Sequence, residues 1–209
     1  MVAAFDVDRT VTTGDCVVPF MIRVGGRGRV TARLGRTGLV HLPVLLRRDR
    51  DRFKALAVRA VFTGRPMADV ERHADEFAAA VAAEKLRDDV VTRMRWHHQH
   101  GHAVVLVSAS LAVYLRPLAM RLGIIEAVLG TELAVAADGR CSGELRGSNC
   151  RGPEKVRRLH AWLEERYGSR SAVELWAYGD SSGDRELLAD ADSAVWAKGT
   201  LAAVPEPVS

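Results

Sequence analysis

Short apolar runs that each stop at a polar residue are the feature that most restricts the fold of this chain. The runs are Val2 to Phe5, Ala103 to Val107, Val173 to Tyr178 and Ala194 to Ala197. The first three stop at Asp6, Ser108 and Gly179-Asp180. Runs this short and this apolar are typical of strands that are buried on both faces, as in a parallel sheet.

Segments with helical periodicity lie between these runs. They are Ser110 to Leu122, Pro153 to Tyr167 and Asp184 to Ala191. Ser110 is a suitable N-cap for the first segment, and Pro153 and Gly168 are start and stop signals for the second. Around Asp138-Gly139, the stretch from Ala134 to Leu145 predicts a β-hairpin. Strands that alternate with helices predict an α/β fold with a parallel sheet.

One segment, from about Gly14 to Arg87, breaks this alternation. It carries helical patterns only, including Phe53 to Phe62 and Ala68 to Glu84. We therefore expect a helical insert over residues 14–87, and a core made of residues 1–13 and 88–209.

Length and composition fit a single globular domain with a small insert. The chain has 209 residues, of which 48% are hydrophobic and 27% charged. No apolar stretch approaches the roughly 20 residues of a membrane-spanning helix, and the N-terminus has no basic region or long apolar segment of a signal peptide. We therefore expect a cytoplasmic protein whose three cysteines are reduced thiols.

Basic residues are concentrated in one part of the chain. Nine arginines and only two acidic residues lie between Arg23 and Arg52, although the net charge of the whole chain is only +4. Such a stretch can bind phosphate-bearing small molecules, anionic lipid headgroups or nucleic acid. An ordinary solvated face is an equally good interpretation, since arginine greatly outnumbers lysine throughout the chain.

Polar residues at the ends of the predicted strands are candidates for a binding site, because open α/β sheets bind ligands at the carboxyl ends of their strands. Asp6 and Asp8 follow the first run, and Asp180 follows the third. Acids this close repel one another unless a divalent cation lies between them, and Mg²⁺ prefers oxygen ligands. Ser108 ends the second run, where its hydroxyl could help to bind an anion or simply cap the next helix, and Lys155 taken alone fits a surface residue better than a ligand.

Taken in order, these residues resemble the four signature motifs of the haloacid dehalogenase superfamily of phosphohydrolases. Asp6-Val7-Asp8-Arg9-Thr10 resembles the first motif, Ser108 the second, Lys155 the third, and Gly179-Asp180-Ser181 with Asp184 the fourth. The resemblance spans essentially the whole chain, and stretches such as VVLVSAS look like the phosphoserine-phosphatase-like branch, subfamily IB. It implies a three-layer α/β/α Rossmann-like core with a helical type 1 cap inserted after the first strand.

The resemblance also implies a role for each residue. Asp6 would attack phosphorus and form an aspartyl-phosphate, and Asp8 would protonate the leaving group and then activate water. Mg²⁺ would be held by Asp6, the backbone carbonyl of Asp8, and Asp180, with Asp184 behind them. Ser108 and Lys155 are implied to contact the phosphoryl group, and Thr10 either contacts it too or steadies the turn.

Two positions depart from the family pattern. Arg9 stands where many relatives have a small residue or glycine, and we expect it in an ordinary right-handed conformation because positive φ would strain it. Asp15 stands where phosphoserine phosphatases carry a glutamate that holds the amino acid, which argues against phosphoserine as the substrate. Asp15 either selects a substrate with hydroxyl or amine groups or caps the first helix of the insert.

A group of histidines precedes the second predicted strand. Its members are His97, His98, His100 and His102. No carboxylate or cysteine nearby completes a metal site, so we expect a solvated turn.

The sequence thus favours a Mg²⁺-dependent phosphatase that acts on a small phosphorylated metabolite. One alternative keeps the chemistry but places it on a phospholipid monoester, with the stretch from Arg23 to Arg52 resting on an anionic membrane. Another is a non-catalytic module that binds an anionic partner or nucleic acid through the same arginines. We consider the module and a nucleic-acid partner the least favoured, because they give the acidic residues no purpose.

Overall fold

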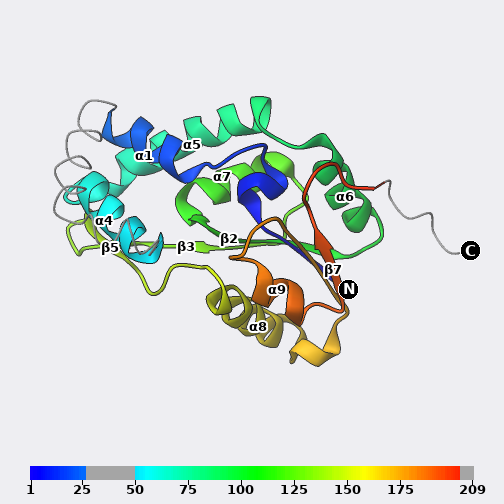
Figure 1. The fold of residues 1–209 in the computed structure, drawn as a ribbon. Coiled ribbons are helices and arrows are strands. Elements are labelled where there is room, and N and C mark those ends of the chain that lie inside the picture. The colour runs from blue at the N-terminus through cyan, green and yellow to red at the C-terminus, as the bar shows by residue number, and fades with distance from the viewer. Residues whose placement is uncertain (27–49, 203–209) are drawn as a thin grey trace, which may run out of the picture.

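The computed structural model describes residues 1–26 and 50–202, and a sheet of five parallel strands lies at its centre (Figure 1). The strands are β1 (Val2–Phe5), β2 (Ala103–Leu111), β3 (Ala127–Thr131), β6 (Leu175–Gly179) and β7 (Ser193–Trp196). Their order is β3-β2-β1-β6-β7, so β1 lies in the middle and pairs with β2 and β6. The predicted α/β fold with a parallel sheet is therefore confirmed, and all four predicted strands are present.

The sequence analysis does not predict β3. This strand lies at one edge of the sheet, and its first three residues are only half-buried. An edge strand needs no continuous apolar run, because only part of its surface packs against other elements. The pattern that identifies the four other strands is therefore weak here.

Helices cover both faces of this sheet. The helices of the core are α6 (Asp88–Gln99), α7 (Ala112–Leu122), α8 (Pro153–Tyr167) and α9 (Arg185–Asp190). In Figure 1, α8 and α9 lie below the sheet, and α6 and α7 lie on the other side. Side chains of β1 alternate accordingly: Val2 and Ala4 pack with α8 and α9, whereas Ala3 and Phe5 pack with α6 and α7. This arrangement is the predicted three-layer core.

The predicted helix boundaries hold for α8 and fail for α7. α8 starts with Pro153 in its first turn and ends at Gly168, which has a left-handed conformation with φ of 84°. The prediction that Ser110 is the N-cap of α7 is wrong. Ser110 is the penultimate residue of β2, and α7 begins only after Leu111. The hydroxyl of Ser110 donates instead to Oδ2 of Asp8 at 2.7 Å.

Three helices between β1 and α6 form the insert in the described part of the chain. They are α1 (Val17–Gly25), α4 (Arg50–Phe62) and α5 (Met67–Glu84). α5 packs along α7, and α4 packs on a hairpin of β4 (Leu133–Val135) and β5 (Cys141–Leu145), which confirms the predicted hairpin. Aromatic rings pack between the insert and the core. The ring centroids of Phe20 on α1 and Phe77 on α5 lie 4.8 Å and 5.3 Å from that of Tyr114 on α7.

The structure also bears on two expectations from the composition, which concern the cysteines and membrane-spanning helices. Cys16, Cys141 and Cys150 are buried free thiols, as expected. Within residues 1–26 and 50–202, no helix has both the length and the apolar character that crossing a membrane requires.

The predicted solvated turn of histidines is wrong for His97. The ring of His97 is fully buried, and its Nε2 lies 2.8 Å from the hydroxyl of Tyr178 on β6. Its Nδ1 lies 2.8 Å from Nδ1 of His102. Burial lowers the pKa of His97 to about 3, so the ring is neutral and acts as a packed, hydrogen-bonded member of the core.

The expected conformation of Arg9 is also wrong. Arg9 has φ of 62° and ψ of −3°, which is left-handed, in the tight turn over Val7–Val11 that follows β1. The turn is fixed from outside, because Arg87 donates from Nη1 to the carbonyl of Arg9 at 3.1 Å and Thr12 donates to the carbonyl of Val7 at 3.0 Å. These bonds hold a conformation that L-residues disfavour by roughly 1–2 kcal/mol.

This strain predicts a specific order of stabilities. Arg9→Gly should be more stable than Arg9→Ala by about 1 kcal/mol, because both variants lose the side chain but only glycine adopts positive φ freely. Chemical denaturation of the two variants measures this difference. Equal stabilities, or a more stable alanine variant, would mean that the turn does not hold position 9 in the left-handed region.

Candidate active site

The carboxyl ends of the central strands open into a cavity of about 770 Å³. Asp6 follows β1, Ser108 lies on β2, and Asp180 follows β6. Lys155, from the first turn of α8, and Asp184, the residue before α9, complete the set. The topology therefore brings together five polar residues that the sequence spreads over its whole length, and all five line the cavity.

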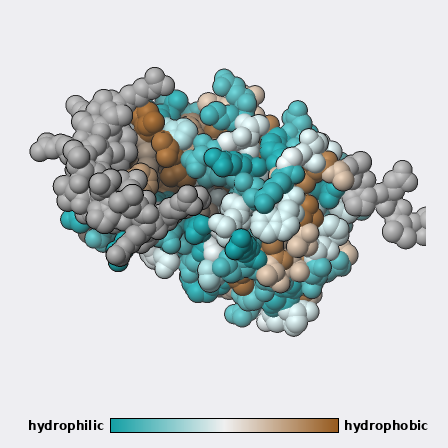
Figure 2. All heavy atoms as spheres, viewed as in Figure 1, coloured by the Kyte–Doolittle hydropathy of each residue, from teal (hydrophilic) through white to brown (hydrophobic). Residues whose placement is uncertain are grey.

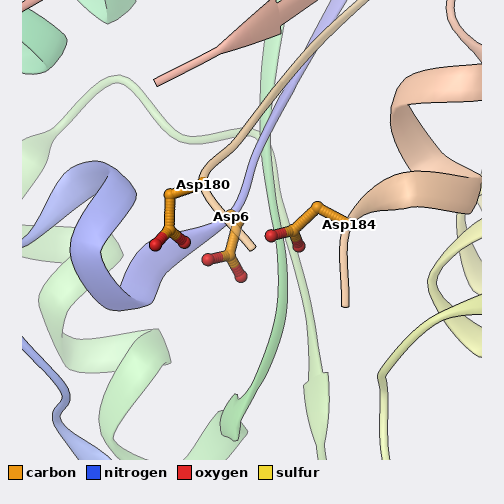
Figure 3. A group of neighbouring side chains, drawn as sticks. All are labelled: Asp6, Asp180 and Asp184. Atoms are coloured by element: carbon orange, nitrogen blue, oxygen red, sulfur yellow. The ribbon is translucent and has the colours of Figure 1, made fainter. Parts of the chain in front are cut away.

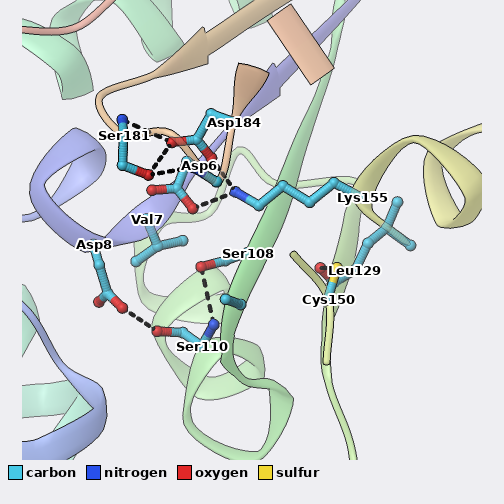
Figure 4. Close-up of polar contacts among 12 residues, drawn as sticks. Asp6, Val7, Asp8, Ser108, Ser110, Leu129, Cys150, Lys155, Ser181 and Asp184 are labelled. Carbon is cyan, nitrogen blue, oxygen red and sulfur yellow. Dashed lines mark hydrogen bonds and ion pairs between the residues drawn. The ribbon is translucent and has the colours of Figure 1, made fainter. Parts of the chain in front are cut away.

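A buried ammonium lies at the centre of this group (Figure 4). Nζ of Lys155 lies 2.6 Å from Oδ1 of Asp6 and 2.5 Å from Oδ1 of Asp184, and its side chain is only 2% exposed. Burial alone would lower the pKa of Lys155, but the two carboxylates outweigh it and raise the pKa. Lys155 is therefore a fixed positive charge beneath the cavity.

Asp6 is a carboxyl group held between opposing influences. Burial raises its pKa to about 7, and the Lys155 ammonium acts in the opposite direction. The value of about 7 already includes the carboxylates of Asp184 and Asp8, which raise the pKa in the same direction as burial. Any second cation placed beside Asp6 would relieve this repulsion and favour the ionised form.

Three carboxylates are arranged so that they could hold such a cation. Oxygens of Asp6, Asp180 and Asp184 lie within 4.8 Å of one another (Figure 3). Both oxygens of Asp184 are already engaged, Oδ1 by Lys155 and Oδ2 by the hydroxyl of Ser181 at 2.7 Å. Hard oxygen donors of this kind fit Mg²⁺. The engaged oxygens of Asp184 favour Asp6 and Asp180 as the direct ligands.

Asp8 lines the same cavity, but its carboxylate contacts Ser110, whereas that of Asp6 contacts Lys155 (Figure 4). Its Oδ2 accepts a hydrogen bond from Ser110, and its Oδ1 accepts one from the backbone N–H of Cys16 at 3.0 Å. Burial, reinforced by the charge of Asp15, raises the pKa of Asp8 to about 6. A carboxyl group with this pKa can donate or accept a proton near neutral pH.

The remaining predicted residues divide into two groups. Ser108 lines the cavity, and its Oγ accepts a hydrogen bond from the backbone N–H of Ser110 at 3.1 Å. Asp15 also lines the cavity, but its Oδ1 accepts hydrogen bonds from the N–H groups of Val17 and Val18, so it caps α1 as well. Thr10 is fully buried, its hydroxyl has no partner within residues 1–26 and 50–202, and it does not line the described wall of the cavity.

Sequence reasoning missed two charged residues of the cavity, Arg151 before α8 and Lys54 on α4. Nζ of Lys54 lies 2.8 Å from Oδ1 of Asn149 and 3.2 Å from Oγ1 of Thr131, and it also donates to the carbonyl of Ala109. Burial lowers the pKa of Lys54 to about 8. A lone lysine in an amphipathic helix carries no signal that it is buried, so the sequence could not have identified it.

Most of the basic stretch from Arg23 to Arg52 lies outside the described residues, which resume at residue 50. Arg23 forms an ion pair with Glu76 of α5 at 2.9 Å. The alternatives for the arginines of this stretch, a solvated face, contact with an anionic membrane or the less favoured contact with nucleic acid, therefore stay untested.

Comparison with known proteins gives consistent matches. A family model described as haloacid dehalogenase-like hydrolase matches residues 3–189. Protein CicA of Caulobacter vibrioides (strain NA1000 / CB15N) is 37% identical over 196 residues, which cover 92% of this chain and 83% of that protein. A protein of unknown function from Bordetella pertussis Tohama I has a similar structure, with a TM-score of 0.75, 22% identity, and coverage of 90% of this chain and 85% of that one. A substrate-bound phosphoserine phosphatase has a TM-score of 0.60 and 16% identity, with 91% and 82% covered.

The three carboxylates predict that Mg²⁺ stabilises the folded protein. Saturation to one hundred times the dissociation constant should raise the Tm at neutral pH by about 5–10 °C. The raised pKa values of Asp6 and Asp8 mean that these carboxyls stabilise the metal-free fold only at low pH, and that this contribution is lost as the pH rises through about 6 to 7. The Mg²⁺ effect should therefore be smaller at pH 5, where protons occupy the site.

Thermal unfolding with and without Mg²⁺ tests this prediction. Asp180→Asn should remove most of the shift, whereas Asp138→Asn, an exposed residue of the hairpin turn, should not. A shift that is unchanged in Asp180→Asn would place the cation elsewhere.

The position of Asp184 depends on Gly179 at the end of β6, because there is no room for a Cβ between the two residues. A Cβ at Gly179 would lie 2.5 Å from Cβ of Asp184, so Gly179→Ala must displace that carboxylate from Lys155. We expect the affinity for Mg²⁺ to fall by roughly 10–100-fold, as when residues behind metal ligands are changed. Gly14→Ala is the matched control, because a Cβ there meets no atom within 4 Å. Equal Mg²⁺ affinities for the two variants, measured by calorimetry, would contradict this role of Asp184.

Proposed function

The chain belongs to the family of haloacid dehalogenase-like hydrolases, and from that premise we propose that it is a Mg²⁺-dependent phosphatase of small phosphate monoesters. The observation that carries the proposal is the Lys155 ammonium held between Asp6 and Asp184 at the base of the cavity, with Asp8 on the same wall. Phosphoryl transfer depends mainly on positioning and on neutralising negative charge, and this arrangement supplies both.

Asp6 is the nucleophile of the proposed reaction. A carboxylate oxygen of Asp6 attacks phosphorus, the bond from phosphorus to the ester oxygen breaks, and an aspartyl-phosphate forms. Lys155, which already contacts Asp6, and the hydroxyl of Ser108 stabilise the negative charge of the phosphoryl oxygens. The hydroxyl of Thr10 has no hydrogen-bond partner among the described residues and does not line the cavity, which supports the second of its two expected roles, in the turn.

Asp8 is the proton donor and acceptor. Its pKa of about 6 leaves it able to protonate the departing ester oxygen in the first step. The resulting carboxylate then accepts a proton from the water that attacks phosphorus, which releases inorganic phosphate and regenerates Asp6. Relatives that cleave carbon–halogen bonds lack this second acid, so Asp8 supports phosphate ester hydrolysis.

Mg²⁺ fits the donor set at the same site. Asp6 and Asp180 would bind it with carboxylate oxygens, together with the backbone carbonyl of Asp8, and Asp184 would orient Lys155. When bound, the ion supplies positive charge that brings the phosphoryl group and the anionic nucleophile together. The oxygen-only donors and the raised pKa values of Asp6 and Asp180 support this assignment, because a cation would relieve the repulsion.

Substitution of the two acids separates their roles. Asp6→Asn should abolish turnover of every phosphate ester while Lys155 keeps its contact with Asp184. Asp8→Asn should slow the first step, in which the alcohol is released, by on the order of a hundredfold to ten-thousandfold for alkyl phosphates, but much less for p-nitrophenyl phosphate, because a good leaving group needs no proton.

Single-turnover rates of alcohol or p-nitrophenol release test these expectations, with circular dichroism to check folding. For alkyl phosphates, the rate of the first step in the wild-type protein should fall as the pH rises above the Asp8 pKa of about 6, and Asp8→Asn should lose this dependence. An equal loss for both leaving groups would exclude Asp8 as the acid. Near-normal activity of Asp6→Asn would exclude Asp6 as the nucleophile.

A further inference from the structure

We propose that the organic group of the substrate is apolar, and that it binds against a wall formed by α1 and α4. This inference rests on the proposed phosphatase function and concerns the part of the same cavity that lies beyond the phosphate. A cavity of about 770 Å³ is much larger than a phosphate group and has the size of a pocket for a small organic ligand.

The side of the cavity that faces the acids is built from apolar side chains. α1 contributes Val17, Val18 and Met21, and α4 contributes Phe53 and Ala57. Hydrophobic side chains gather over α1 on the face shown in Figure 2. Val18 and Phe53 are 47% and 37% exposed, so both offer apolar surface to a ligand in the cavity.

Helical spacing places these residues on one surface. Val17 and Met21 are four residues apart on α1, Val18 and Met21 are three apart, and Phe53 and Ala57 are four apart on α4. α1 and α4 pack against each other, so the two helices form a continuous apolar wall.

The one cation in the described part of this wall is already fully used. An ammonium has three N–H donors, and Nζ of Lys54 has three acceptors on the core: the Ala109 carbonyl, Thr131 and Asn149. Lys54 therefore fastens α4 to the core, and it cannot bind a substrate carboxylate without losing one of these bonds. The wall offers little to a zwitterionic substrate such as phosphoserine.

The two arginines that line the described part of the cavity lie on its core side. Arg9 follows β1 and Arg151 precedes α8, so both belong to the core side. Asp15 lies beside α1, but one of its oxygens accepts the N–H groups of Val17 and Val18. The charged end of the cavity thus suits the phosphate, and the opposite end suits a hydrocarbon group.

A series of n-alkyl phosphates, from methyl to hexyl, tests the proposal. Each buried methylene should raise kcat/KM about threefold to fourfold until the wall is covered. Glycerol phosphate and phosphoserine should react no faster than methyl phosphate. Values that do not change with chain length, or a preference for the polar esters, would overturn the apolar subsite.

The two proposals fail in different ways. If alkyl and aryl phosphates are all hydrolysed but without dependence on chain length, only the apolar subsite is wrong. If no phosphate ester is hydrolysed in the presence of Mg²⁺, the phosphatase function itself is wrong, and the subsite falls with it.

Variants of the exposed wall residues test its location. Val18→Asn and Phe53→Asn should lower the ratio of the hexyl to the methyl kcat/KM by about threefold to tenfold each. Met120→Asn is the matched control, because Met120 is exposed on α7 and does not line this cavity. An unchanged ratio in both wall variants, with the Tm preserved, would overturn the assignment to α1 and α4.

An apolar phosphate monoester is either a soluble molecule or a lipid. Comparison of hexyl phosphate in solution with phosphatidic acid in phosphatidylcholine vesicles distinguishes these sources. Hydrolysis of both supports the apolar subsite with a membrane lipid as substrate, and hydrolysis of hexyl phosphate alone supports it with a soluble substrate. Failure of both, while methyl phosphate is hydrolysed, would overturn it.

Discussion

A buried ammonium between two carboxylates is the interaction on which the site depends. Lys155 on α8 reaches Asp6 at the end of β1 and Asp184 before α9, so three segments from opposite ends of the chain meet at one nitrogen. Removing one partner of a buried pair of this kind costs about 3–5 kcal/mol, because a charge is left without compensation. The parallel sheet satisfies this requirement, since it delivers the ends of β1 and β6 to one edge while α8 packs beneath them. Catalytic geometry and stability are therefore linked through the same contacts.

The sequence predicts most of this core because its signals are local. Apolar runs that stop at acids identify β1 and β6, and the carboxyl ends of parallel strands necessarily meet at one edge. Proline and glycine mark both ends of α8, so the first turn that carries Lys155 is placed correctly. The fold follows from such patterns, whereas the juxtaposition of Asp6, Lys155 and Asp184 is expected only from the resemblance to the haloacid dehalogenase superfamily. The β3 strand does not follow from local patterns, because its apolar run, Ala127 to Leu129, is too short to be distinguished from a loop.

Residues whose state depends on distant partners could not be predicted. Arg9 is left-handed because hydrogen bonds from other segments fix its turn, and no property of arginine indicates this. His97 is buried in the core, where its Nε2 lies 2.8 Å from the hydroxyl of Tyr178 on β6. Lys54 belongs to the cavity because three core acceptors surround its nitrogen. In each case the contact joins residues far apart in the sequence, and a single sequence does not show which distant residues meet in the fold.

The most direct test of the account is the identity of the residue that becomes phosphorylated. Asp8→Asn should slow the breakdown of the intermediate, so acid quenching of this variant with p-nitrophenyl phosphate, followed by proteolysis and mass spectrometry, should trap it. The account predicts a phosphoryl group on the peptide that contains Asp6, and none when Asp6→Asn is added. A phosphoryl group on any other residue, or turnover with no phosphorylated peptide in the steady state, would contradict it.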